Sequence, residues 1–110
     1  MNQQRLDKLF EFQKEDPNDP FIIYAIANEY NGHDNETALK YYNQLLDEHE
    51  NYTGTYYHVA ALYTQLGDRE KAESIYKKGI LICQQEKDRH ALSELQRAYN
   101  DFLYDDEDEW

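Results

Sequence analysis

The sequence predicts an all-α protein made of stacked antiparallel helix pairs. Apolar residues recur at intervals of three and four, which are the intervals of a buried helix face. One such pattern repeats after 33 or 34 residues, and a tight turn divides each repeat in two. At 110 residues the chain suits one modest core. We therefore expect a single helical domain with about six helices.

The repeat pairs residues of the same size class. The pairs are Ile23 with Tyr56, Ile26 with Val59, Ala27 with Ala60, Tyr30 with Tyr63, Ala38 with Ala72 and Tyr42 with Tyr76. The first four pairs are 33 residues apart and the last two are 34 apart, so the first repeat lacks one residue in its turn. Each repeat is thus expected to be a helix, a tight turn and a second helix.

Helix ends are signalled by capping residues. Asp19 before Pro20 is typical of a helix start, because Asp caps the first turn and proline fits the first helical position. Gly67 suits the left-handed residue after a helix, and Asp68 suits the cap of the next one. The helices are expected near residues 3–15, 20–31, 35–48, 53–65, 69–83 and 88–104.

Two small residues are expected on the facing sides of each hairpin. Ala27 with Ala38, and Ala60 with Ala72, would let the paired helices approach closely. In the helix of residues 3–15 the corresponding position is Arg5, and in the helix of residues 88–104 it is Gln96. These outer helices have no hairpin partner of their own, so a small residue would bring no gain. They are expected to act as caps.

The pattern apolar-x2-apolar-Ala-x2-Tyr, followed by Ala-x3-Tyr, resembles the tetratricopeptide repeat (TPR) family over residues 17–84. The closing proline of that family is replaced by Glu50 and Gln84, and Pro17 stands in its place before the first unit. The resemblance implies a right-handed superhelix, a TPR-like α-solenoid. Its units would be residues 20–51 and 53–84, within one domain over 1–104 and ahead of an acidic disordered tail over 105–110.

Charge and composition limit the class of partner. The net charge is −12, and residues 1–50 hold eleven acidic but only four basic residues. Nucleic acid and anionic membranes are therefore disfavoured, and a basic or neutral protein or peptide is favoured. No apolar run is long enough to span a membrane, and we expect a cytoplasmic protein. The single cysteine, Cys83, is expected to be a buried small hydrophobe.

The sequence predicts no enzyme and no cofactor. Only Ser74 and Ser93 are serines, and no glycine-rich phosphate loop is present. The histidines share no metal-ligand spacing, so no metal site is predicted. His58 and His90 fall on the first helices of consecutive units, which leaves a metal or pH-sensing role as an alternative to two solvated side chains.

The resemblance implies that a ligand would lie along a concave groove built by the first helix of each pair. The groove positions most suited to binding are Tyr24, Asn28, Tyr57, His58 and Arg97. Of the carboxylate clamp used by chaperone-binding members of the family, only Asn28 matches. A packing role for the tyrosines is the alternative to binding. For the whole chain, the alternative is a structural scaffold, monomer or weak homodimer, that self-associates through its end or convex helix faces.

Overall fold

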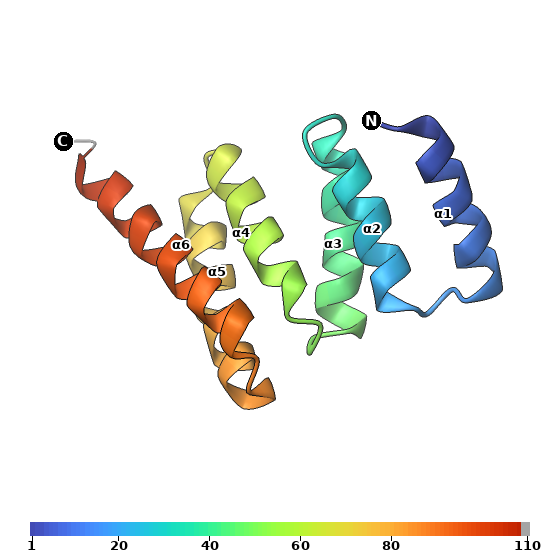
Figure 1. Ribbon diagram of the computed structural model, residues 1–110. Coiled ribbons are helices and arrows are strands. Elements are labelled where there is room, and N and C mark those ends of the chain that lie inside the picture. Colours follow the sequence, from blue (N-terminus) through green and yellow to red (C-terminus); the bar gives the residue numbers. More distant parts are fainter. Residues whose placement is uncertain (109–110) are drawn as a thin grey trace. The chain divides into compact units, whose positions relative to one another are not determined.

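The computed structural model describes residues 1–108, which form six α-helices and no strand (Figure 1). The all-α prediction is confirmed. The helices are α1 (Gln3–Glu15), α2 (Pro20–Tyr30), α3 (Asn35–Glu48), α4 (Gly54–Gln65), α5 (Arg69–Glu86) and α6 (Arg89–Asp108).

The predicted and observed helix ends differ most in the last two helices of the chain. Helix α5 continues three residues past the expected end at Cys83 and stops at Lys87, whose φ of 59° is left-handed. Helix α6 continues to Asp108, so residues 105–108 are helical where a disordered tail was expected. A helix that has already formed gains one backbone hydrogen bond for each residue added, which offsets the repulsion between acidic side chains. Residues 109 and 110 lie outside the described residues.

The predicted capping residues are confirmed. The Asp19 side chain accepts a hydrogen bond from the Phe21 backbone N–H at the start of α2. Asp68 accepts one from the Lys71 N–H at the start of α5. Gly67, between α4 and α5, has a φ of +84°, which only glycine adopts without strain. The turn therefore forms where the sequence placed it.

The helices form two compact units, Met1–Tyr52 and a second that begins at Thr53. The single domain over residues 1–104 stays a prediction. The first unit contains α1, α2 and α3, with α2 antiparallel to both neighbours (Figure 1). The buried apolar side chains of this unit are Leu6, Leu9, Ile22, Ile23, Ile26, Ala27, Ala38, Tyr42 and Leu45.

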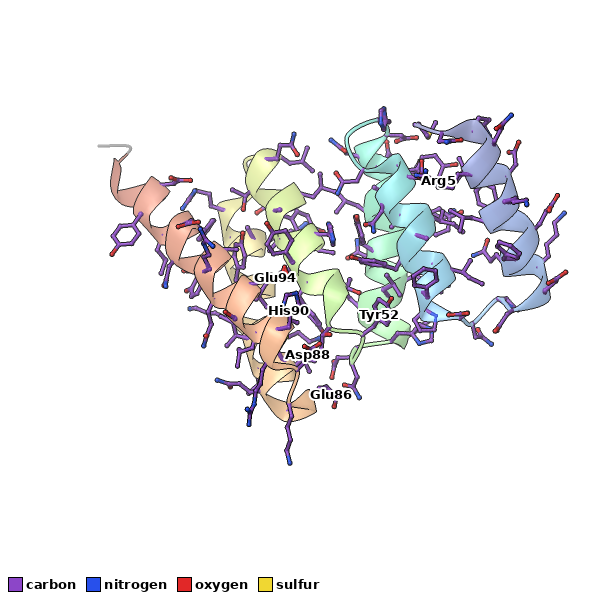
Figure 2. All side chains as sticks on the ribbon, viewed as in Figure 1. Arg5, Tyr52, Glu86, Asp88, His90 and Glu94 are labelled. Atoms are coloured by element: carbon purple, nitrogen blue, oxygen red, sulfur yellow. The ribbon has the colours of Figure 1, made fainter. Side chains whose placement is uncertain are left out.

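A polar contact explains the large residue at Arg5 in this unit. The Arg5 guanidinium donates to the Glu29 carboxylate on α2 at 2.7 Å, and Figure 2 labels Arg5 on α1. This hydrogen bond, followed by one from the Asn2 backbone, lowers the pKa of Glu29. A long charged side chain at position 5 therefore joins α1 to α2, whereas the corresponding positions of the hairpins are alanine.

The second unit contains α4, α5 and α6, and α6 packs against both other helices. Its buried apolar side chains are Tyr56, Val59, Ala60, Leu62, Ala72, Tyr76, Ile82, Cys83, Leu95 and Phe102. Two polar contacts hold α6 in place. The Thr53 hydroxyl donates to the Asp88 carboxylate at 2.6 Å, and the Arg69 guanidinium donates to the Phe102 carbonyl at 2.8 Å.

The four alanines expected on the facing sides of the hairpins are buried. Ala27 and Ala38 in the first unit, and Ala60 and Ala72 in the second, are all fully buried. A fifth small residue, Gly79, was not predicted and is buried on the same face of α5 as Ala72.

Gly79 lies where a methyl group has no room. A Cβ built on it would stand 2.5 Å from the Cβ of Tyr56 on α4 and 2.6 Å from the Cδ2 of Leu95 on α6. The Tyr56 contact involves an atom next to the backbone, which cannot rotate away. Both α4 and α6 therefore approach α5 closely at Gly79.

We predict that Gly79→Ala destabilises the protein, although alanine is normally the better helix residue by about 1 kcal/mol. Overpacking against Tyr56 and Leu95 is expected to outweigh that gain and lower the free energy of unfolding by about 1–3 kcal/mol. Urea denaturation followed by circular dichroism measures the change. Ser74→Ala, at an exposed position of the same helix, is the control and should be neutral or slightly stabilising. A Gly79→Ala variant as stable as the parent would contradict the close approach.

Candidate functional site

The predicted binding residues divide between the two units. Tyr24 and Asn28 lie one turn apart on α2, in the first unit. Tyr57 and His58 lie on α4 and Arg97 lies on α6, in the second unit.

A hollow of about 260 Å³ opens on the second unit, between α4 and α6. Its lining brings together two of the predicted residues, Tyr57 and Arg97, with side chains that the prediction did not include. The lining residues are Tyr57, Glu94, Arg97, Ala98 and Asp101. Ala98 and Asp101 were missed, although their spacing of four and seven residues from Glu94 places them on the same face of a helix.

Tyr57 is the large apolar side chain of this hollow. Its side chain is 44% exposed, and its ring packs edge-on against the His58 ring at a centroid distance of 5.6 Å. His58 is half-buried. Burial lowers the pKa of His58, and the Glu94 carboxylate acts in the opposite direction. The His58 ring supports the Tyr57 ring through this edge-on contact.

The second histidine considered for a metal or pH role lies beside the same carboxylate. The Nε2 of His90 is 3.1 Å from an oxygen of Glu94, one turn further along α6. Figure 2 shows Asp88, His90 and Glu94 in succession along the start of this helix. The His90 side chain is 88% exposed. Among the described residues, no three His, Cys, Asp or Glu side chains are grouped in a way that could hold a metal ion.

In the first unit, Tyr24 packs against another aromatic residue. Its ring centroid is 5.4 Å from that of Tyr52, with the planes tilted by 58°. The Tyr24 side chain is only partly exposed. Contact with Tyr52 thus accounts for part of the burial of the Tyr24 ring, which agrees with the packing role considered for the tyrosines.

Asn28 is committed to the fold of the first unit. The hydroxyl of the fully buried Tyr42, on α3, donates to the Asn28 side-chain oxygen at 2.5 Å, and Asn31 donates to the same hydroxyl at 3.2 Å. Burial raises the pKa of Tyr42 to about 12, while the hydrogen bond from Asn31 lowers it. The amide oxygen of Asn28 therefore satisfies a buried hydroxyl, which the sequence pattern did not reveal.

Two larger hollows lie on the first unit and were not predicted. One, of about 650 Å³, is lined by Pro20 and residues 47–52, where three carboxylates gather near the end of α3. The other, of about 560 Å³, lies along α1 and is more apolar. Its lining residues are Asn2, Gln4, Arg5, Lys8, Leu9 and Phe12.

The single thiol does not have the surroundings of a nucleophile. Cys83 is fully buried, and burial, followed by the charge of Asp88, raises its pKa. A reactive cysteine needs a lowered pKa and access to solvent. Within residues 1–108, no helix has the length and apolar character that crossing a bilayer requires.

Comparison with known proteins points to one family, both by sequence and by structure. A family model described as tetratricopeptide repeat matches residues 53–86. A tetratricopeptide repeat domain protein from Salinibacter ruber is similar in its crystal structure, with 38% identity, a TM-score of 0.72, and coverage of 77% of this chain and 96% of that chain. A solution NMR structure of such a domain from the same organism has 40% identity, a TM-score of 0.74, and coverage of 79% and 89%.

A more distant solved structure shares the fold. A protein from Bordetella parapertussis has 19% identity and a TM-score of 0.80, over 94% of this chain and 91% of that chain. A search of curated proteins gives no match.

We predict that Asn28→Ala destabilises the first unit, because the buried Tyr42 hydroxyl loses its acceptor. Removing one hydrogen-bond partner of a buried polar group costs about 1–3 kcal/mol, although Asn31 still donates to the same hydroxyl oxygen. Thermal and urea denaturation measure the loss. Asn43→Ala, at an exposed position of α3, is the control and should leave stability unchanged. If Asn28→Ala were equally neutral, the hydrogen bond to Tyr42 would not be structural and a binding role for Asn28 would be favoured.

Proposed function

This chain belongs to the tetratricopeptide repeat family, and from this we propose that it is a non-enzymatic interaction module that holds a peptide or protein segment. Stacked helical hairpins generally serve to bind other proteins along the surface of their first helices. The segment would lie on the second unit, along α4 and α6, with the Tyr57 ring as its apolar anchor.

The observation that supports this proposal is the exposed ring of Tyr57 at the edge of the 260 Å³ hollow. A tyrosine ring offers a large contact area at small entropic cost, and exposed aromatic residues are frequent anchors at interfaces. His58 supports the ring from one side. Arg97 and the carboxylates of Glu94 and Asp101 offer donors and acceptors to the backbone of an extended segment.

The charge of the surface favours a basic or neutral partner. Two of the lining side chains are acidic and one is basic, and the whole chain carries a net charge of −12. Nucleic acid and anionic membranes would be repelled by this balance. A cytoplasmic location is part of the proposal, since the single thiol is suited to a compartment in which cysteines stay reduced.

The contribution of the first unit is expected to be smaller. Asn28 is bonded to Tyr42, and the Tyr24 ring packs on Tyr52. The extension of the groove to Tyr24 stays a prediction.

A library of displayed random peptides, selected against the parent chain, provides the ligand for a direct test. We predict that Tyr57→Ala weakens binding of the selected peptide by tenfold or more, because loss of an aromatic anchor commonly costs about 2 kcal/mol. Tyr57→Phe should retain most of the affinity. Arg97→Ala should weaken binding less, since its side chain lies at the rim. Isothermal titration calorimetry measures each affinity.

Lys77→Ala is the control, because Lys77 is exposed on α5 and lies outside the hollow. Each variant must melt near the parent temperature, so that lost binding does not reflect unfolding. If Tyr57→Ala binds the peptide as tightly as the parent while Lys77→Ala does not, the binding surface lies elsewhere.

A further inference from the structure

The hollow along α1 is an apolar surface with a positive rim. Phe12, at one end of it, is 48% exposed although it is a large aromatic side chain. Arg5 and Lys8 both line the hollow, whereas Asp7 and Glu11 on the same helix do not. The surface therefore suits an occupant that brings apolar side chains together with negative charge.

The C-terminal half of α6 has the complementary character. Leu103 is 39% exposed and Tyr104 is 65% exposed, and they are followed by the exposed Asp105. From residue 98 to residue 109 the sequence contains six acidic residues and no basic one. The negative end of the helix dipole adds to this charge.

We propose that the hollow on α1 of one copy binds the Leu103–Asp105 end of α6 of a second copy. The exposed rings of Phe12 and Tyr104 would bury each other, and the Lys8 ammonium would lie near the Asp105 carboxylate. The two surfaces are different, so the contact is heterologous and joins copies head to tail. This inference is separate from the proposed function, because it uses neither Tyr57 nor Arg97.

Basic side chains in both units already have acidic or aromatic partners. Lys71, on α5, already lies 3.8 Å from the Asp68 carboxylate and 5.6 Å from the centre of the Tyr63 ring. In the first unit Arg5 is bonded to Glu29. Lys8 therefore supplies most of the attraction of the α1 hollow for the acidic end of a second copy.

A contact limited to one hollow and one helix end is small. Interfaces of this size are typical of transient association, so we expect a dissociation constant in the micromolar range or weaker. Exposed charges contribute to it and each copy carries a net charge of −12, so the association should depend on salt concentration.

Two blocked variants test the direction of the contact. The first, Lys8→Glu with Phe12→Ala, removes the α1 surface and keeps the α6 end. The second, Tyr104→Ala with Asp105→Lys, removes the α6 end and keeps the α1 surface. In sedimentation velocity the parent should associate as concentration rises, and each variant alone should stay monomeric. An equimolar mixture of the two should form a heterodimer and nothing larger, since only one productive pair of surfaces remains.

Phe21→Ala is the matched control, because Phe21 is 60% exposed in the same unit but lies outside the hollow. It should associate as the parent does. Circular dichroism must show that both blocked variants retain the helical content of the parent. A parent that stays monomeric at millimolar concentration and low salt would overturn the proposal. So would blocked variants that associate on their own, or a mixture that stays monomeric while the parent associates.

The Tyr57→Ala variant separates this proposal from the proposed function. Tyr57→Ala should associate with itself as the parent does, even where it has lost the selected peptide. Loss of self-association in Tyr57→Ala would instead place the contact at the hollow between α4 and α6, and would overturn this inference without affecting the proposed function.

Discussion

Close approach of helices through small side chains is the constraint on which both units depend. The buried small residues of α2 and α3 are Ala27 and Ala38, and those of α4 and α5 include Ala60 and Ala72. With so little bulk between the helix axes, the larger residues one turn away reach the opposite helix and fill the space beside the crossing. Tyr42 and Tyr76 are buried in this way. Gly79 has the same effect on a third helix, since its missing side chain leaves room for Tyr56 of α4 and Leu95 of α6.

Filling a core with tyrosine requires partners for the hydroxyl groups. The Tyr42 hydroxyl is satisfied by Asn28 and Asn31, and the Tyr99 hydroxyl donates to Glu73 at 3.0 Å. These bonds offset the cost of burying a polar tip with each ring. They also explain why a helix surface that looks suited to ligands can be committed to the fold. The polar atom of Asn28 faces the hydroxyl of a neighbouring helix, so its residue type alone did not indicate its role.

The repeat made the helices predictable because it combined a helical period with capping residues at fixed places. Asp19, Gly67 and Asp68 each act locally, so their effect could be inferred from the residues beside them. Gly79 could not be found in this way, since the aligned residue of the first repeat is Leu45 and the requirement for glycine comes from Tyr56 on α4 and Leu95 on α6, which are both distant in the chain. The lining of the hollow beside Tyr57 likewise depends on how α6 packs against α4.

The large polar residues of the two outer helices set the character of any association between copies. A permanent hairpin between α6 of one copy and α1 of another would need small residues at their crossing. Gln96 and Arg5 occupy those positions, and Arg5 is held by Glu29. The helices therefore cannot approach as α2 and α3 do, and a contact between copies must stay shallow and reversible. Reversible head-to-tail contacts would place several Tyr57 surfaces in one assembly, so that a partner with repeated segments would bind with higher avidity than a single chain provides.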